Sequence, residues 1–350
     1  MKLPKSDIKK IAIFRALQLG DMLCAIPAFR ALRKSFPDAE ITLLGLPWAK
    51  MLVERFPVYL DHFIHFPGYP GLPEQSFDAL EFHQFTGKMI EKQYDLILQM
   101  QGNGSIVNPM IELFGATYTA GFCLKDDYAP NKEFFMEYPE GIHEVERHLK
   151  LMRYLGIDAL DTAIEFPIYP QDEEDLKLSG LSLQQGKYVC VHPGSRGAWR
   201  QWPPEYFARL TDRCTAEGLE VVLTGTREEL FIVQEVESHM KHKPLIAAGK
   251  TSIGAVALLI RDAFLLISNC TGVSHIAAAL KTPSVVISMD GEPERWAPMN
   301  KDLHRAIDWT KNPDFSAVAS QLEYLITSSP QWDQIREGIR VSLKDRADSV

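Results

Sequence analysis

Short β-rich runs alternate along this chain with segments of helical periodicity, and this alternation constrains the fold more than any other feature of the sequence. We predict strands at 11–14, 41–46, 95–100, 188–191, 219–224, 264–268 and 284–289. Helices are predicted between strands, including 21–35, 205–217 and 255–261, with a kink or a late start at Pro27 in the first of them. Strands separated by helices form βαβ units with parallel strands, so the predicted class is α/β.

The length of 350 residues is enough for two domains of ordinary size. The segment 166–187 contains two prolines and an acidic run, which favours a connection between domains. We therefore predict domains at 1–165 and 188–315, followed by a region at 316–350 with amphipathic helical character. A cleft between two such domains is a favoured ligand site.

Charge and composition narrow the class of protein. Thirty-seven basic and 46 acidic residues give a net charge of −9, which argues against nucleic-acid binding. The five cysteines include no Cys-x-x-Cys pair, and no histidine–carboxylate cluster predicts a metal or another cofactor. No Gly-x-Gly-x-x-Gly follows the first strand and no P-loop is present, which disfavours NAD-type Rossmann and P-loop enzymes. The polar start and the lack of a long apolar run predict a cytoplasmic protein.

The first predicted strand leads into Gly20 and Asp21 at the start of a helix. An aspartate at this position commonly caps the helix and interacts with its dipole. Alternatively, the Asp21 carboxylate lies at the rim of the cleft and takes a proton from an incoming hydroxyl, while Gly20 allows close approach to the backbone. One residue can have both roles.

A second loop, His-Pro-Gly-Ser at 192–195, follows the strand at 188–191, with Arg200 just downstream. In isolation it would be a strand-exit turn with solvated arginines. Together, the Ser195 hydroxyl, the open backbone at Gly194 and the fixed charge of Arg200 suit a diphosphate. Glu229, after the next strand, is either a helix-dipole partner or an acceptor for ribose hydroxyls.

A third loop, at 270–275, follows the strand at 264–268 and leads into an alanine-rich helix. Gly272 opens the first turn, so the N–H groups from Thr271 onward can face a phosphate. His275 is either a structural residue or a ligand contact. A nucleophilic pair of Cys270 and His275 would have poor geometry across a helix start.

Taken together, these loops resemble glycosyltransferase family 9, the ADP-heptose:lipopolysaccharide heptosyltransferases. The resemblance covers roughly residues 10–300 and rests on several motifs in order. They are Leu-Gly-Asp at 19–21 before Ala-Ile-Pro-Ala at 25–28, Ser-Phe-Pro-Asp-Ala at 35–39, His-Pro-Gly-Ser at 192–195 with Trp-Pro at 202–203, Gly225 with Glu229, Ala-Gly-Lys-Thr-Ser at 248–252, and Thr-Gly at 271–272 with His-Ile-Ala-Ala at 275–278.

The resemblance implies a GT-B fold, in which two Rossmann-like parallel-sheet domains face each other across a cleft. The first domain would bind mainly the acceptor, the second would bind the nucleotide-sugar, and the helices at 316–350 would cross back to the first. By position, Asp21 would be the general base. The donor side would contain Gly20, Ser195, Arg200, Glu229, Thr251, Cys270, Thr271, Gly272 and His275. The chain departs from the family pattern at two positions, because Arg200 stands where lysine is usual and Cys270 where aspartate is found.

The implied activity is an inverting, metal-independent transfer of heptose or a related sugar from a nucleoside-diphosphate sugar, ADP-linked by resemblance. The acceptor would be a lipopolysaccharide-type or other cell-envelope glycan or glycolipid, and no cofactor is implied. The working location would be the cytoplasm, with peripheral contact at the inner membrane face. The alternatives are a nucleotide-sugar epimerase, which would turn over donor without acceptor, and a non-catalytic nucleotide-sugar or glycan-binding protein.

Overall fold

The computed structural model describes residues 3–328, and the chain divides after Pro167 into two compact units. Each unit is built on a six-stranded sheet in which every neighbouring pair is parallel. The strand order is β3-β2-β1-β4-β5-β6 in the first sheet and β12-β11-β10-β7-β8-β9 in the second. Counted from its own first strand, each sheet has the 3-2-1-4-5-6 order of dinucleotide-binding folds. The predicted α/β class with two Rossmann-like parallel sheets is confirmed.

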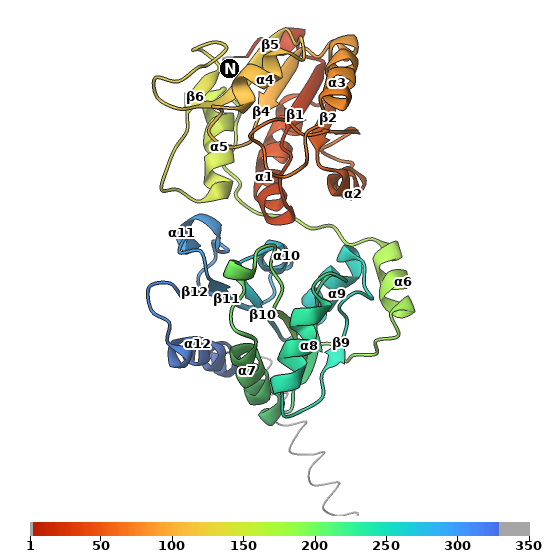
Figure 1. Ribbon diagram of the computed structural model, residues 1–350, viewed down its shortest axis with the longest axis vertical. Helices are drawn as coiled ribbons and strands as arrows, with labels where there is room; N and C mark the ends of the chain where they lie inside the picture. Colours follow the sequence, from red (N-terminus) through yellow and green to blue (C-terminus); the bar gives the residue numbers. More distant parts are fainter. Residues whose placement is uncertain (1–2, 329–350) are drawn as a thin grey trace, which may run out of the picture. The chain divides into compact units, whose positions relative to one another are not determined.

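The first unit alternates strands with helices, except that β5 is followed directly by β6 (Figure 1). Its elements are β1 (Lys10–Phe14), α1 (Leu19–Ser35), β2 (Glu40–Gly45), α2 (Lys50–Arg55), β3 (His62–His65), α3 (Ala79–Lys92), β4 (Leu96–Gln99), α4 (Val107–Glu112), β5 (Tyr118–Cys123), β6 (Phe135–Glu137) and α5 (Glu144–Tyr154).

The second unit repeats this plan (Figure 1). Its elements are α6 (Pro170–Leu178), β7 (Tyr188–His192), the 3-10 turn η3 (Ala198–Arg200), α7 (Pro204–Ala216), β8 (Glu220–Leu223), α8 (Leu230–His239), β9 (Leu245–Ile246), α9 (Ile253–Asp262), β10 (Leu265–Asn269), α10 (Gly272–Leu280), β11 (Ser284–Ser288), α11 (Pro293–Trp296), β12 (His304–Asp308) and α12 (Phe315–Ser328).

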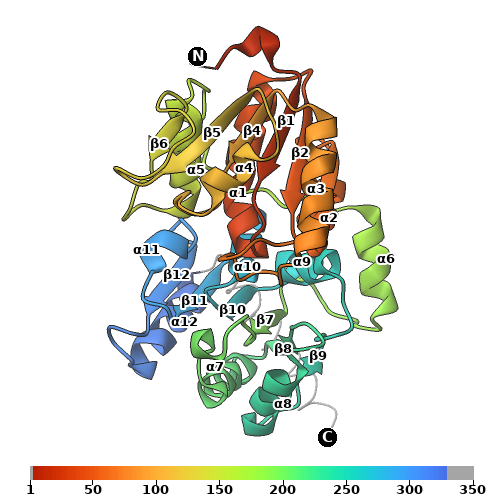
Figure 2. The same ribbon diagram turned by 45° about the horizontal axis from the view of Figure 1, so that its top comes forward.

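Successive residues of a strand point to opposite faces of the sheet, and the central strands of the first unit carry apolar residues on both faces. These residues form its core. Phe14 of β1 and Ile97 of β4 share one cluster with Phe85 of α3 and Met110 of α4. Figure 2 shows α3 lying along the strands of this sheet. α1 packs beside α5, and α1 runs without interruption through Pro27, so a late helix start is not observed.

The core of the second unit includes its last described helix. Val191 of β7 and Ile267 of β10 cluster with Phe207 of α7, and Val318 and Leu322 of α12 belong to the same core. The predicted crossing of the helices at 316–350 to the first domain stays a prediction. The tail at 329–350 lies outside the described residues. Within 3–328, no helix is both long and apolar enough to cross a membrane.

All seven predicted strands are present, as β1, β2, β4, β7, β8, β10 and β11. The sequence did not indicate β3, β6, β9 and β12, which lie at sheet edges, or the interior strand β5. The segment 166–187, predicted as a connection, also contains α6, which packs against α9 of the second unit.

Candidate active site

The loop that follows β7 in the second sheet is joined to the end of β10 by one buried side chain, Asn269, the last residue of β10. Its Nδ2 donates to the carbonyls of Pro193 at 2.7 Å and Gly194 at 3.3 Å, and its Oδ1 accepts from the Trp202 N–H at 2.9 Å. The amide of Gln201 also donates to the Ser195 carbonyl, at 3.0 Å. The loop that carries Ser195 and Arg200 is therefore attached to the end of β10. Sequence reasoning missed Asn269, although a polar residue that ends a buried apolar strand was a usable signal.

Glu229 lies against the loop that follows β7. A Cβ added to Gly194 would come within 2.2 Å of a Glu229 carboxylate oxygen, so glycine is required for this approach. The Glu229 carboxylate accepts from the Thr226 N–H at 2.8 Å and lies 3.8 Å from His192 Nε2. Burial lowers the pKa of His192, and the neighbouring Glu229 opposes that shift. The predicted donor residues Ser195 and Glu229 are thus brought to one place.

Arg200 forms an ion pair with Asp290, which follows β11 and was not predicted as a site residue. Asp290 Oδ1 accepts from the Ser288 hydroxyl at 2.7 Å and from the Glu292 N–H at 3.2 Å. The buried Cys270 lies within the field of both charges. Burial, with a smaller contribution from Asp290, raises the pKa of the Cys270 thiol to about 12, although Arg200 opposes the rise. A thiol that remains protonated at neutral pH is no nucleophile, which disfavours the Cys270–His275 pair.

α10 starts where the sequence predicted a helix start. Thr271 is its N-terminal flanking residue and Gly272 its first helical residue, directly after Cys270. His275 is on the buried side of the helix, with 2% of its surface exposed. Thr251 donates to the Ala247 carbonyl within its own loop, at 3.2 Å.

In the first unit, Asp21 lies in the first turn of α1, after the carboxyl end of β1, with Gly20 beside it. The guanidinium of Arg15 donates to the Asp21 backbone carbonyl from Nε at 3.1 Å and from Nη2 at 2.8 Å. Burial raises the pKa of the Asp21 carboxyl, Arg15 opposes this, and Glu144 adds to it. Buried carboxylates with shifted pKa values are common in functional sites, which makes Asp21 a candidate site residue.

A buried charge cluster on α5 supports this region, and the sequence did not reveal it. Glu144 pairs with Arg147 and, at 3.3 Å, with Arg15, and its Oε1 lies 3.2 Å from His148 Nε2. Burial alone would raise the pKa of Glu144, but His148 and the two arginines hold it well below the usual range. Burial, reinforced by Arg15, lowers the pKa of His148 to about 4, so the ring is neutral at pH 7.

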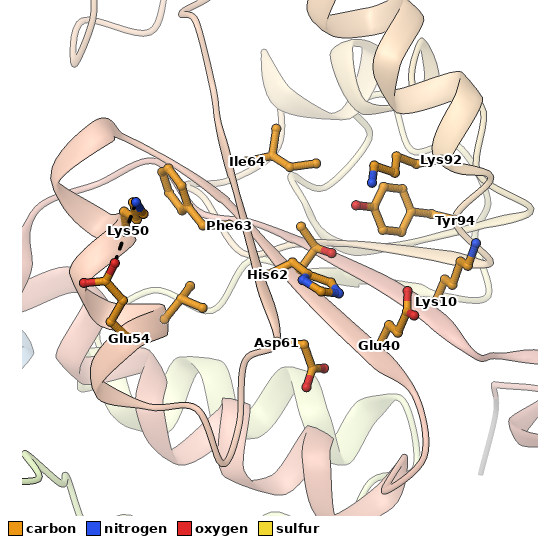
Figure 3. Close-up of a pocket in the computed structure, with 12 residues that line it drawn as sticks. Lys10, Glu40, Lys50, Glu54, Asp61, His62, Phe63, Ile64, Lys92 and Tyr94 are labelled. Carbon is orange, nitrogen blue, oxygen red and sulfur yellow. Dashed lines mark ion pairs between the residues drawn. The ribbon is translucent and has the colours of Figure 1, made fainter.

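A cavity of about 430 Å³ opens at the amino ends of β1, β2 and β3 in the first sheet (Figure 3). Lys10, Glu40 and His62 line it, and each begins its strand, whereas Asp21 follows the end of β1. Lysines and carboxylates both line the opening, with Lys50 and Glu54 paired at 3.8 Å. This cavity is not the predicted site.

A family model and similar sequences indicate the same family. A family model described as glycosyltransferase family 9 (heptosyltransferase) matches residues 82–324. Lipooligosaccharide heptosyltransferase 2 of Haemophilus ducreyi is 24% identical over 330 residues, covering 85% of this chain and 89% of that protein. Lipopolysaccharide heptosyltransferase 3 of Escherichia coli is 26% identical over 302 residues, covering 81% and 84%.

Two solved structures share the fold at low sequence identity. The E. coli ADP-heptose lipopolysaccharide heptosyltransferase II has a TM-score of 0.71 at 20% identity, over 91% of this chain and 98% of that one. The E. coli heptosyltransferase WaaC, solved with ADP, has a TM-score of 0.67 at 18% identity, over 90% and 99%.

Proposed function

The chain belongs to glycosyltransferase family 9 and is a glycosyltransferase, and we propose that it transfers heptose or a related sugar from an ADP-linked donor to a lipopolysaccharide-type glycan. The names of the matching heptosyltransferases support the sugar and the acceptor class. The similar structure that contains ADP supports the nucleotide. The first unit would bind mainly the acceptor and the second the donor. With a glycolipid acceptor, the transfer reaction would take place at the cytoplasmic face of the membrane.

The proposed reaction is a single displacement with inversion and without a metal. The acceptor oxygen attacks the anomeric carbon as its proton passes to the Asp21 carboxylate. The bond from that carbon to the diphosphate breaks on the opposite face, and the nucleoside diphosphate leaves with the bonding electrons. Arg200, the Ser195 hydroxyl and the N–H groups at the start of α10 would stabilise the charge that develops on the leaving group.

The environment of Asp21 is the observation that supports its proposed role as the general base. Its carboxyl follows the end of β1 and has a raised pKa because it is buried beside Glu144. A base whose pKa lies closer to the working pH accepts a proton more readily in the transition state. The nearby Arg15 fixes the backbone at this residue through the Asp21 carbonyl.

The donor proposal is tested by thermal unfolding with ADP, UDP, GDP and dTDP and with their sugar conjugates. A ligand at 100 times its dissociation constant stabilises the folded state by about 2.7 kcal/mol. We expect stabilisation by ADP compounds only, and a weaker but measurable response in Arg200→Ala. A preference for another nucleotide would replace the donor, and donor turnover in the absence of any acceptor would contradict the proposed transfer.

A further inference from the structure

The carboxylate of Asp290 has no role in the proposed function, yet its surroundings are built to hold it in place. Its side chain is 7% exposed, whereas that of Arg200 is 32% exposed. The Ser288 hydroxyl and the Glu292 N–H both bond to Oδ1, and Oδ2 is directed to Arg200 Nη2. The three bonds fix the carboxylate plane, and with it the position of one edge of the guanidinium.

An arginine gains from such a partner more than a lysine does. The guanidinium is a planar fork with five N–H groups, so its orientation decides which of them can meet a diphosphate. One edge of Arg200 is directed to the largely buried Asp290, while the residue as a whole keeps contact with solvent. An ion pair that uses one edge of the fork thereby orients the other edge.

The same corner of the site contains the other departure from the family pattern. Cys270 follows β10 and donates its N–H to the carbonyl of Ile287 on β11 at 2.8 Å, so the ends of these two strands are adjacent. The charges of both Arg200 and Asp290 act on the Cys270 thiol. Position 270 thus lacks the carboxylate of the family pattern. Position 290, just after β11, has a carboxylate that pairs with Arg200.

We propose that Asp290 is a positioning residue that orients the Arg200 guanidinium for the donor diphosphate, supplying from the segment after β11 the carboxylate that position 270 lacks. The proposal rests on the donor site described above, because it assigns Arg200 to the diphosphate. Asp290 acts through Arg200 and takes no part in the proton transfer.

The direction in which ADP affinity changes in Asp290→Asn distinguishes a positioning role from mere competition for Arg200. Asp290→Asn removes a negative charge beside the proposed anion site. If Asp290 only competes with ADP for Arg200, this variant should bind ADP more tightly than the wild type. A positioning carboxylate predicts the reverse, a loss of about tenfold in ADP affinity, which is the size of one charge-assisted hydrogen bond. Calorimetric titration of the full-length protein with ADP measures this change.

Three further variants make the test specific. Asp308→Asn is the matched control, because Asp308 ends the next strand, β12, and pairs with Lys311 at 3.3 Å. In an Arg200→Ala background, Asp290→Asn should no longer change the ADP affinity. Cys270→Asp combined with Asp290→Asn should recover part of the lost affinity, since it returns a carboxylate to the same arginine.

The outcomes distinguish the two proposals. If the wild-type protein binds none of the nucleoside diphosphates, the donor site fails, and this inference fails with it. If the wild type binds ADP but Asp290→Asn binds it equally or more tightly, only the positioning role is overturned. An effect of unchanged size in the Arg200→Ala background would also overturn it, because Asp290 would then act independently of Arg200.

Discussion

Gly194 and Glu229 show how a single missing Cβ shapes the proposed donor site. A methyl group at 194 would meet the Glu229 carboxylate at 2.2 Å, but that carboxylate is the mobile end of its side chain. Gly194→Ala should therefore displace Glu229 and leave the fold intact. We expect it to weaken ADP binding about as much as Glu229→Ala does, and the two effects should not add.

A matched control for this prediction is Gly87→Ala in α3, where an added Cβ has no atom within 4 Å. A glycine-to-alanine change inside a helix stabilises by about 0.5–1 kcal/mol and should leave ADP affinity unchanged. If Gly194→Ala and Glu229→Ala weaken binding additively, the two residues do not act through one contact.

The pKa of Asp21 predicts the acidic side of the pH–rate profile. A general base must be deprotonated, so kcat/KM falls as the pH decreases through the pKa of Asp21, and this fall should occur above the ordinary value of 3.8. Because the charge of Glu144 contributes to raising that pKa, Glu144→Gln should move the fall to lower pH.

Glu146→Gln is the control for this pH shift, since Glu146 lies on the same helix but pairs with Arg153. The pH dependence of kcat/KM for the three proteins measures the effect. A profile that is flat through the acidic range, or identical in wild type and Glu144→Gln, would show that Asp21 is not the titrating base.

At the level of elements, the periodicity of the sequence predicted the buried strands other than β5 and missed the strands at the sheet edges. β7 and β10 are continuous apolar runs, as expected for strands covered on both faces. β3 and β12 lie at sheet edges and contain histidines or charged residues. β5 contains Gly121. Only glycine fits there, because an added Cβ would lie 2.7 Å from Gln99.

The site was predictable in its loops but not in the residues that join them. Ser195, Glu229 and the 270–272 turn follow strands, and the strand ends of a parallel sheet meet at one edge. Asn269 contacts Trp202 across 67 positions, and Arg15 contacts Glu144 across 129. No local pattern encodes partners at such separations, so only the fold reveals them.

Asn269 provides the test of this joining role. Asn269→Ala removes three hydrogen bonds of a fully buried side chain, and unsatisfied buried partners cost about 1–3 kcal/mol each. We expect a clear decrease in thermal stability together with weaker ADP binding, because the 193–202 loop loses its attachment to β10.

Asn108→Ala is the matched control, since buried Asn108 donates to the Phe122 carbonyl at 3.0 Å in the first unit. It should reduce stability by a similar mechanism and leave ADP affinity intact. Equal losses of ADP affinity in the two variants would refute a specific role for Asn269.

On the scale of the whole molecule, each unit contains a buried histidine whose pKa is lowered to about 4. Burial lowers the pKa to about 4 for both His148 of the first unit and His304 of the second. The unfolded chain takes up these protons near pH 6.5 and the folded chain does so only near pH 4, so stability is highest above pH 6.5 and decreases between these values.

At pH 5 this difference amounts to about 2 kcal/mol for each histidine. Urea unfolding at pH 7 and pH 5, followed by a probe in each unit, measures it. His304→Gln should reduce the pH dependence of the second unit and leave that of the first unchanged. Equal unfolding midpoints at the two pH values would contradict the burial of uncharged histidines.

The most direct test of the account compares Asp21→Asn with the wild type in two measurements on the same preparations: ADP affinity, and the rate of heptose transfer from ADP-heptose to a lipopolysaccharide-type acceptor. The account predicts unchanged ADP affinity and a transfer rate lower by about 10²–10⁴, the usual range for loss of a general base. A transfer rate equal to that of the wild type would contradict it.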